Sequence, residues 1–154
     1  MYDLKFMATV SSVLTLWLFS SMCLVKIALT RRYSLIYIIM AFIPPLQLFV
    51  VAKIVNAYCT DLLGNIFVIG ILSSFLQAAL NSGIEEIMSN ISDNTYHMLK
   101  FISIQIFYLP PSWYIWRKIA KEGKHKRPDL LGILTGISII EPFAAFYITW
   151  KGEW

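Results

Sequence analysis

One carboxylate in this chain lies where a charge is costly. Glu141 sits near the middle of an apolar run, residues 130–150, directly before Pro142. At the centre of a membrane helix a charged side chain costs about 2.5 to 3.5 kcal/mol on insertion scales, so something must offset that cost. The carboxyl can be held protonated and neutral, or it can pair with a cation such as Lys53 or Lys26.

Three roles for Glu141 remain open from its position. It is a proton or cation site beside a broken helix, as in many transporters; or a structural group that hydrogen-bonds one helix to its neighbours; or a residue at a shallow re-entrant tip that reaches water. Gln47 and Gln105 lie in other apolar runs, where amides bond across helices. Together with Lys53 they complete the set of candidate intramembrane polar or ionic sites.

Prolines mark where the apolar runs are expected to bend. Proline removes a backbone donor and clashes with the preceding turn. Three of the runs contain one, so these helices are expected to be kinked or broken. The candidate breaks are at Pro44, Pro45, Pro110, Pro111 and Pro142.

The elements that would position these residues are helices in lipid. The chain of 154 residues is 58% hydrophobic and 14% charged, whereas soluble domains are about 25% charged. A single all-α, polytopic membrane domain is therefore predicted, a small bundle of four to five segments of roughly 20 residues. The expected segments are residues 7–29, 35–57, 62–80, 96–116 and 130–150.

A short amphipathic helix is expected at the membrane surface over residues 83–92. Ser82 and Glu85 match a capping box, and the apolar residues that follow have helical spacing. This helix carries an acidic face and a glycosylation sequon at residues 90–92, both of which suit the non-cytoplasmic side.

The positive charges give conflicting signals about topology. Arg31 and Arg32 follow the first segment, which predicts a non-cytoplasmic N-terminus. The loop at residues 117–127 is more basic still, so it is predicted to be cytoplasmic. If all five segments cross the membrane, however, this loop and the loop with Arg31 and Arg32 lie on opposite sides. A re-entrant hairpin at Pro44-Pro45 removes the conflict; five true spans with one basic loop outside is the alternative.

Residues 41–46 also line up weakly with residues 138–143, a faint sign of internal duplication.

The basic loop is the expected contact for lipid. Basic residues beside a membrane attract anionic head groups at about 1 kcal/mol each; the loop could equally serve orientation alone or bind an acidic partner. A net charge of +4 carried in loops between apolar runs favours orientation in a membrane over nucleic-acid binding. The residues of this patch are Arg117, Lys118, Lys121, Lys124, Lys126 and Arg127.

No motif of soluble enzyme chemistry is found in the sequence. It carries no nucleophile elbow, phosphate loop, dinucleotide fingerprint or metal-ligand spacing, so neither a metal nor a cofactor is expected. Catalysis is not expected either; the alternative is a membrane-embedded enzyme that acts on lipid. Two functions follow for a protein of the plasma membrane, an inner membrane or an endomembrane. One is a non-catalytic accessory, assembly or inhibitory subunit that binds a membrane partner through its helices. The other is a small proton- or cation-coupled transporter or channel, as a homo-oligomer, with Glu141 as its titrating site.

Overall fold

The computed structural model is all-helical over the residues it describes, which are 4–87, 93–137 and 139–154. The all-α prediction is therefore confirmed. The elements in chain order are α1 (Leu4–Thr30), α2 (Leu35–Met40), η1 (Pro44–Leu46), α3 (Gln47–Ile54), α4 (Cys59–Ile87), α5 (Asp93–Glu122), α6 (Pro128–Gly136) and α7 (Glu141–Lys151).

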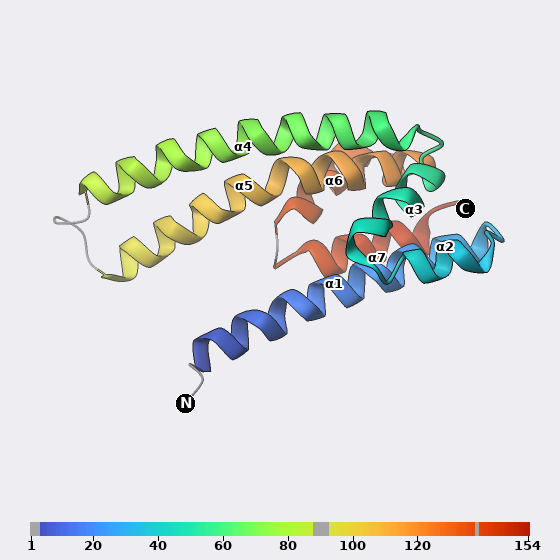
Figure 1. Ribbon diagram of the computed structural model, residues 1–154, viewed down its shortest axis with the longest axis horizontal. Coiled ribbons are helices and arrows are strands. Elements are labelled where there is room, and N and C mark those ends of the chain that lie inside the picture. The colour runs from blue at the N-terminus through green and yellow to red at the C-terminus, as the bar shows by residue number, and fades with distance from the viewer. Residues whose placement is uncertain (1–3, 88–92, 138) are drawn as a thin grey trace.

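Three long helices and two hairpins of short helices make up the fold (Figure 1). α4 and α5 form an antiparallel pair, and α1 lies on the other side of the molecule with α7 packed along it. The first hairpin, α2–η1–α3, follows α1, and the second, α6–α7, follows α5. Both hairpins begin and finish at the end of the molecule where α1 and α5 end.

The chain turns back at Pro44-Pro45, the position at which the sequence predicted a re-entrant hairpin. α2 ends at Met40, the two prolines open the 3₁₀ turn η1, and α3 returns toward the start of α4. The two arms have 6 and 8 residues, each less than half of the roughly 20 that a membrane span needs. This return brings the two basic loops to the same end of the molecule, where the side chains of Arg31 and Glu122 lie 3.6 Å apart.

The single segment expected over residues 130–150 is wrong in its geometry. The structure divides it into α6, with 9 residues, and α7, with 11. The break follows Gly136, and α7 restarts at Glu141 with Pro142 in its first turn, where a missing amide proton costs no helical hydrogen bond. A break at Pro142 was predicted, and a reversal of the chain at this point was one of the three alternatives considered for Glu141.

Two other expected helix boundaries are also wrong. α5 continues as one helix through Pro110 and Pro111, so it is not broken there, and α6 packs against this stretch with Gly136 next to Leu109. No separate helix begins at residue 83, since α4 continues to Ile87 and the Ser82 hydroxyl donates to the carbonyl of Ala78 within it. The remainder of that predicted helix, with the sequon, lies outside the described residues.

α1 and α5 end in the same way. Arg32 and Lys124 have φ angles of 54° and 53°, the left-handed conformation of a helix C-cap. In each helix the next amide reaches back across the turn: Tyr33 to the carbonyl of Ala28 at 2.9 Å, and His125 to that of Ala120 at 3.1 Å.

This likeness extends into the helices and the hairpins. Residues 20–28 and 112–120 share Ser, Lys, Ile and Ala at matching positions, and both Ile-Ala pairs are fully buried. Tyr33 and His125 then make equivalent contacts to the returning helices. The Tyr33 hydroxyl donates to the carbonyl of Lys53 at 3.2 Å, and Nε2 of His125 lies 2.9 Å from the carbonyl oxygen of Ile148. The unit of long helix, basic turn and short-helix hairpin thus occurs twice, and the weak match of residues 41–46 with 138–143 falls at the two hairpin bends.

The surface of the molecule is unusually apolar. Within the described part of the chain, one helix, residues 59–86 of α4, is long and apolar enough to cross a membrane, with a mean hydropathy of 1.8, and few of its residues are buried. Trp17–Thr30 and Pro44–Ile54 are shorter apolar helical stretches. Large side chains exposed along α4 include Leu63, Phe67, Val68, Leu72, Phe75 and Leu76.

Candidate functional site

A mostly apolar cleft of about 440 Å³ lies between the two halves of the molecule. Residues of α1, α3, α4, α5 and α7 line it, so both hairpins contribute a wall. Its polar lining residues are Ser20, Gln47, Tyr108, Ser112 and Glu141.

Glu141 is buried in this cleft, with only 4% of its surface exposed. It is the first residue of α7, where the positive end of the helix dipole favours negative charge. The hydroxyl of Tyr108 donates to its Oε2 at 2.5 Å, and that of Ser20 donates to its Oε1 at 3.4 Å. The carboxylate therefore connects α7 to both α5 and α1.

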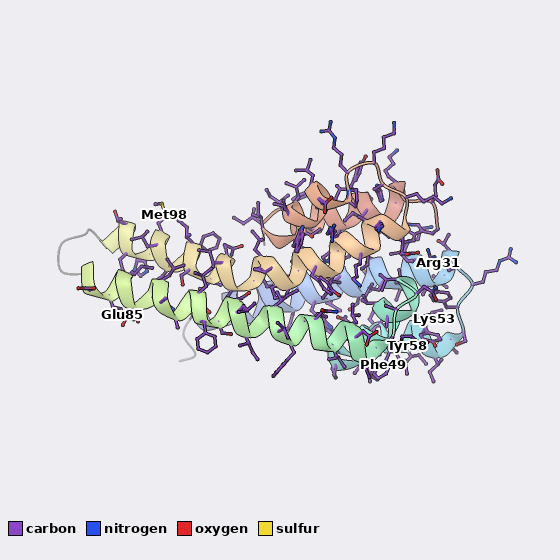
Figure 2. The ribbon with its side chains drawn as sticks, turned by 90° about the horizontal axis from the view of Figure 1, so that it is seen from above. Arg31, Phe49, Lys53, Tyr58, Glu85 and Met98 are labelled. Atoms are coloured by element: carbon purple, nitrogen blue, oxygen red, sulfur yellow. The ribbon has the colours of Figure 1, made fainter. Side chains whose placement is uncertain are left out.

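Hydroxyl groups, rather than a lysine, accompany Glu141. Lys53 is exposed near the end of α3, with its Nζ 6.0 Å from the ring centre of Tyr33. It lies with Arg31 and Tyr58 at one end of the molecule, as Figure 2 shows. Lys26 is also exposed. None of the ion pairs found among the described side chains includes Glu141, so pairing with Lys53 or Lys26 is not what offsets its burial.

Gln47 holds the bend of the first hairpin. Its Nε2 donates at 2.8 Å both to Oγ of Ser21 on α1 and to the carbonyl of Ala41, where α2 ends. Its amide thus lies in the cleft wall while making structural contacts. Gln105 is half-buried on α5 and is not one of the residues that line the cleft.

The sequence did not point to Tyr108 or Ser20. A single tyrosine or serine in an apolar run carries no pattern, and both lie far along the chain from Glu141. It did hold a signal for the tight packing of α6, because Gly132 and Gly136 are spaced as in a small-residue helix contact. A Cβ at Gly132 would come within 2.9 Å of the carbonyl oxygen of Trp113.

The basic patch predicted at residues 117–127 is divided by the structure. Arg117 forms an ion pair with Asp129 and covers the ring of Trp113, and Lys118 covers Tyr114 with its Nζ 4.9 Å from the ring centre. These residues lie on the last turns of α5. Lys124, Lys126 and Arg127 lie beyond the helix, in the turn toward α6.

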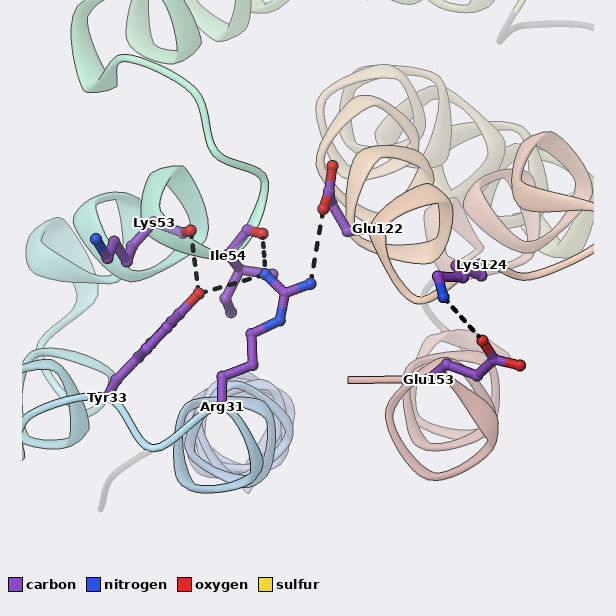
Figure 3. A network of polar contacts seen from close by, with 7 residues as sticks. All are labelled: Arg31, Tyr33, Lys53, Ile54, Glu122, Lys124 and Glu153. Carbon is purple, nitrogen blue, oxygen red and sulfur yellow. Dashed lines mark hydrogen bonds and ion pairs between the residues drawn. The ribbon is translucent and has the colours of Figure 1, made fainter.

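Arg31 joins several segments at the same end of the molecule (Figure 3). Its guanidinium donates to the carbonyl of Ile54 at 2.7 Å and to the hydroxyl of Tyr33 at 3.3 Å, and lies 3.6 Å from the Glu122 carboxylate. It also lies over the ring of Trp154, 5.4 Å from the ring centre. This contact set fixes the first hairpin to the end of α5.

The chemistry available in the cleft is that of one acid with hydroxyl donors. Within the described residues, no group of three or more His, Cys, Asp or Glu could hold a metal ion. Comparison with known proteins adds nothing to this geometry, since no family model, curated protein or solved structure matches the chain.

Proposed function

We propose that the chain is a small multi-pass membrane protein that moves protons or a small cation through the cleft that contains Glu141. The observation that carries this proposal is a buried carboxylate at the start of a half-length helix, in the wall of an open cleft between two hairpins. Discontinuous helices expose free backbone groups inside a bilayer and are a recurrent feature of transporter ion sites, and a carboxylate at such a depth is by default a functional group.

The distribution of charge supports a membrane placement. All Lys and Arg residues except Lys5 and Lys100 fall in segments near the end where α1 and α5 finish. Glu85 and Glu86 lie at the opposite end, where Figure 2 labels Glu85 beside Met98. By the positive-inside rule, the basic end faces the cytoplasm.

The apolar exposure of α4 supports the same placement. A soluble monomer seldom leaves apolar patches larger than a few hundred Å² in water. Phe67 is 68% exposed and Phe75 72%, and Val68, Leu72 and Leu76 on the same stretch of the helix are exposed as well. In lipid, exposing such an apolar face carries no hydrophobic free-energy cost.

Replacing Glu141 by Gln tests the transport function. The amide has nearly the same shape and can still accept from Tyr108, but it can neither release a proton nor pair with a cation. In proteoliposomes containing a pH- or cation-sensitive dye, we expect Glu141→Gln to abolish flux while the melting temperature stays within a few degrees, and Glu141→Asp to retain part of it. Glu85→Gln, at an exposed site, is the matched control. Full flux through a folded Glu141→Gln protein would show that the carboxylate is only structural.

The membrane placement has its own test. In a background without Cys23 and Cys59, single cysteines replace Ser34, Lys126 or Glu86. We expect a membrane-impermeant maleimide to label the first two from one side of the membrane and the third from the other. Labelling of Ser34→Cys and Lys126→Cys from opposite sides would support five full spans instead.

A second candidate function is supported by α4. This helix packs mainly on α5, leaving one apolar side free, and a Cβ at the exposed Gly64 would meet nothing within 4 Å. A small residue on an open face allows another helix to approach closely, as expected for an accessory subunit. Stoichiometric copurification of an unlike membrane protein, lost in Gly64→Leu, would favour it.

A further inference from the structure

A second cleft, which Glu141 does not reach, lies at the basic end. It has a volume of about 570 Å³ and is formed by the turn after α5, the first turns of α6 and the last turn of α7. We name it the basic cleft. Its cationic lining residues are Lys124, Lys126, Arg127 and Lys151, and its apolar ones include Leu130 and Tyr147.

Three of the four cationic residues that line the cleft, all except Lys124, have no acidic partner among the described residues. No Asp or Glu is among its lining residues. The acidic groups nearest in the chain are engaged: Glu153 pairs with Lys124 at 3.1 Å, and Asp129 pairs with Arg117 on the α5 side. The side chains of Lys126, Arg127 and Lys151 are exposed and take part in none of the ion pairs of the described chain.

The walls of the basic cleft hold its charged segment in a fixed position. Nε2 of His125 lies 2.9 Å from the carbonyl of Ile148, and its ring rests on that of Tyr147 with centres 5.7 Å apart, so the turn is fixed to α7. α6 begins at Pro128 beside this turn, and its free first-turn amides add to the positive potential. An anion with several charges fits such a pocket better than a single carboxylate does.

Apolar surface continues from the cleft along both helices of the hairpin. Leu130 and Ile133 on α6 are exposed by 46% and 44%, and Phe143 and Tyr147 on α7 by 76% and 50%. A ligand with a phosphorylated head and an acyl tail would place each part on matching surface. A free phosphate compound would use only the cationic part.

We propose that the basic cleft binds the phosphorylated head group of a membrane lipid, with phosphoinositides as the class that fits best. Basic pockets between helices on the cytoplasmic side are known to suit such head groups, and each basic residue contributes about 1 kcal/mol, or about a fivefold change in affinity. This inference rests on the membrane placement proposed above but not on transport through Glu141.

The test is lipid binding by the whole protein in phosphatidylcholine nanodiscs. We expect phosphatidylinositol bisphosphate to bind more tightly than phosphatidylserine, and Lys126→Gln/Arg127→Gln to weaken it about 25-fold. The matched control is Arg32→Gln/Lys53→Gln, which removes the same charge from the same end of the molecule outside the cleft and should cost less than about threefold. Soluble inositol trisphosphate, offered without a lipid tail, should bind far more weakly than the lipid.

Each contrary result overturns a defined part of the proposal. Equal losses in the two double variants would mean diffuse attraction by the whole basic end. Equal binding of inositol trisphosphate would make the ligand a free phosphate compound. Unchanged lipid binding by Glu141→Gln keeps this test separate from transport, and failure of the wild-type protein to enter nanodiscs would refute the membrane placement itself.

Discussion

Replacing Arg31 by Gln should loosen the end of the molecule where the first hairpin meets α5. The guanidinium is the donor for the carbonyl of Ile54, the last residue of α3, which otherwise has no helical partner. It also reaches the Glu122 carboxylate (Figure 3) and the Trp154 ring, so one substitution removes contacts to three segments.

The magnitude follows from the three contacts. A hydrogen bond from a charged donor contributes about 1.5 to 3 kcal/mol. The ion pair adds less than about 0.5 kcal/mol, because the Glu122 side chain is 38% exposed and solvent screens it. The contact with Trp154 adds about 0.5 to 1 kcal/mol. We therefore expect Arg31→Gln to lower the free energy of unfolding by about 2 to 4 kcal/mol.

Thermal unfolding of the purified protein in mild detergent measures this loss. At about 2 to 4 °C for each kcal/mol in a chain of this size, the melting temperature should fall by about 4 to 16 °C. Arg32→Gln is the matched control, because Arg32 is exposed and adjacent and carries the same charge; it should change stability by less than about 0.5 kcal/mol. Equal melting temperatures for the two variants would refute the argument that these contacts hold the hairpin.

Two further predictions concern packing and the cleft. Gly136→Ala should destabilise the protein by about 1 to 3 kcal/mol, because the added Cβ would lie 2.7 Å from a side-chain atom of α5 and 3.0 Å from its backbone. The control is Gly64→Ala, which should be neutral or stabilising because the added Cβ has open space. Similar melting temperatures for the two variants would contradict this prediction. Tyr108→Phe should lower the free energy of unfolding by about 1 to 3 kcal/mol, because it leaves Glu141 without its closest hydrogen-bond donor. Tyr58→Phe, at an exposed position, is the control. Equal melting temperatures for the two variants would mean that the Tyr108 hydroxyl does not contribute to stability.

The first hairpin could be predicted from sequence because two independent signals agreed on it. Adjacent prolines mark a break, and the basic residues after α1 and α5 require one element between them not to cross. For the second hairpin the distribution of basic residues gave no such indication. A reversal of the chain after residue 130 does not change the side of the membrane on which the earlier basic loops lie. Its one proline suits the first turn of a helix as well as a kink, so the pattern did not distinguish a bent span from a reversal.

The partners of Glu141 could not be predicted because tertiary structure alone brings them together. Tyr108 and Ser20 come from α5 and α1, far along the chain in both cases, and hydroxyl residues are ordinary in apolar helices. The expectation of a lysine partner followed from charge alone. The structure instead uses two hydroxyls and a helix N-terminus, which accommodate a carboxylate in either protonation state without a buried cation.

The two copies of the repeated unit carry different side chains at the bend of the hairpin. Both long helices end in the same C-cap, and both return helices are held by a side chain from that cap. At the bends the two copies differ: in the first, an amide, Gln47, bonds within its own half to Ser21 and Ala41, whereas in the second, Glu141 accepts from α5 and also from α1 of the other half. The contact from Ser20 is long, at 3.4 Å, and crosses between the two halves, so it is the bond most easily exchanged for a ligand. A cation that enters the cleft would therefore compete with the Ser20 hydroxyl before it disturbs either hairpin.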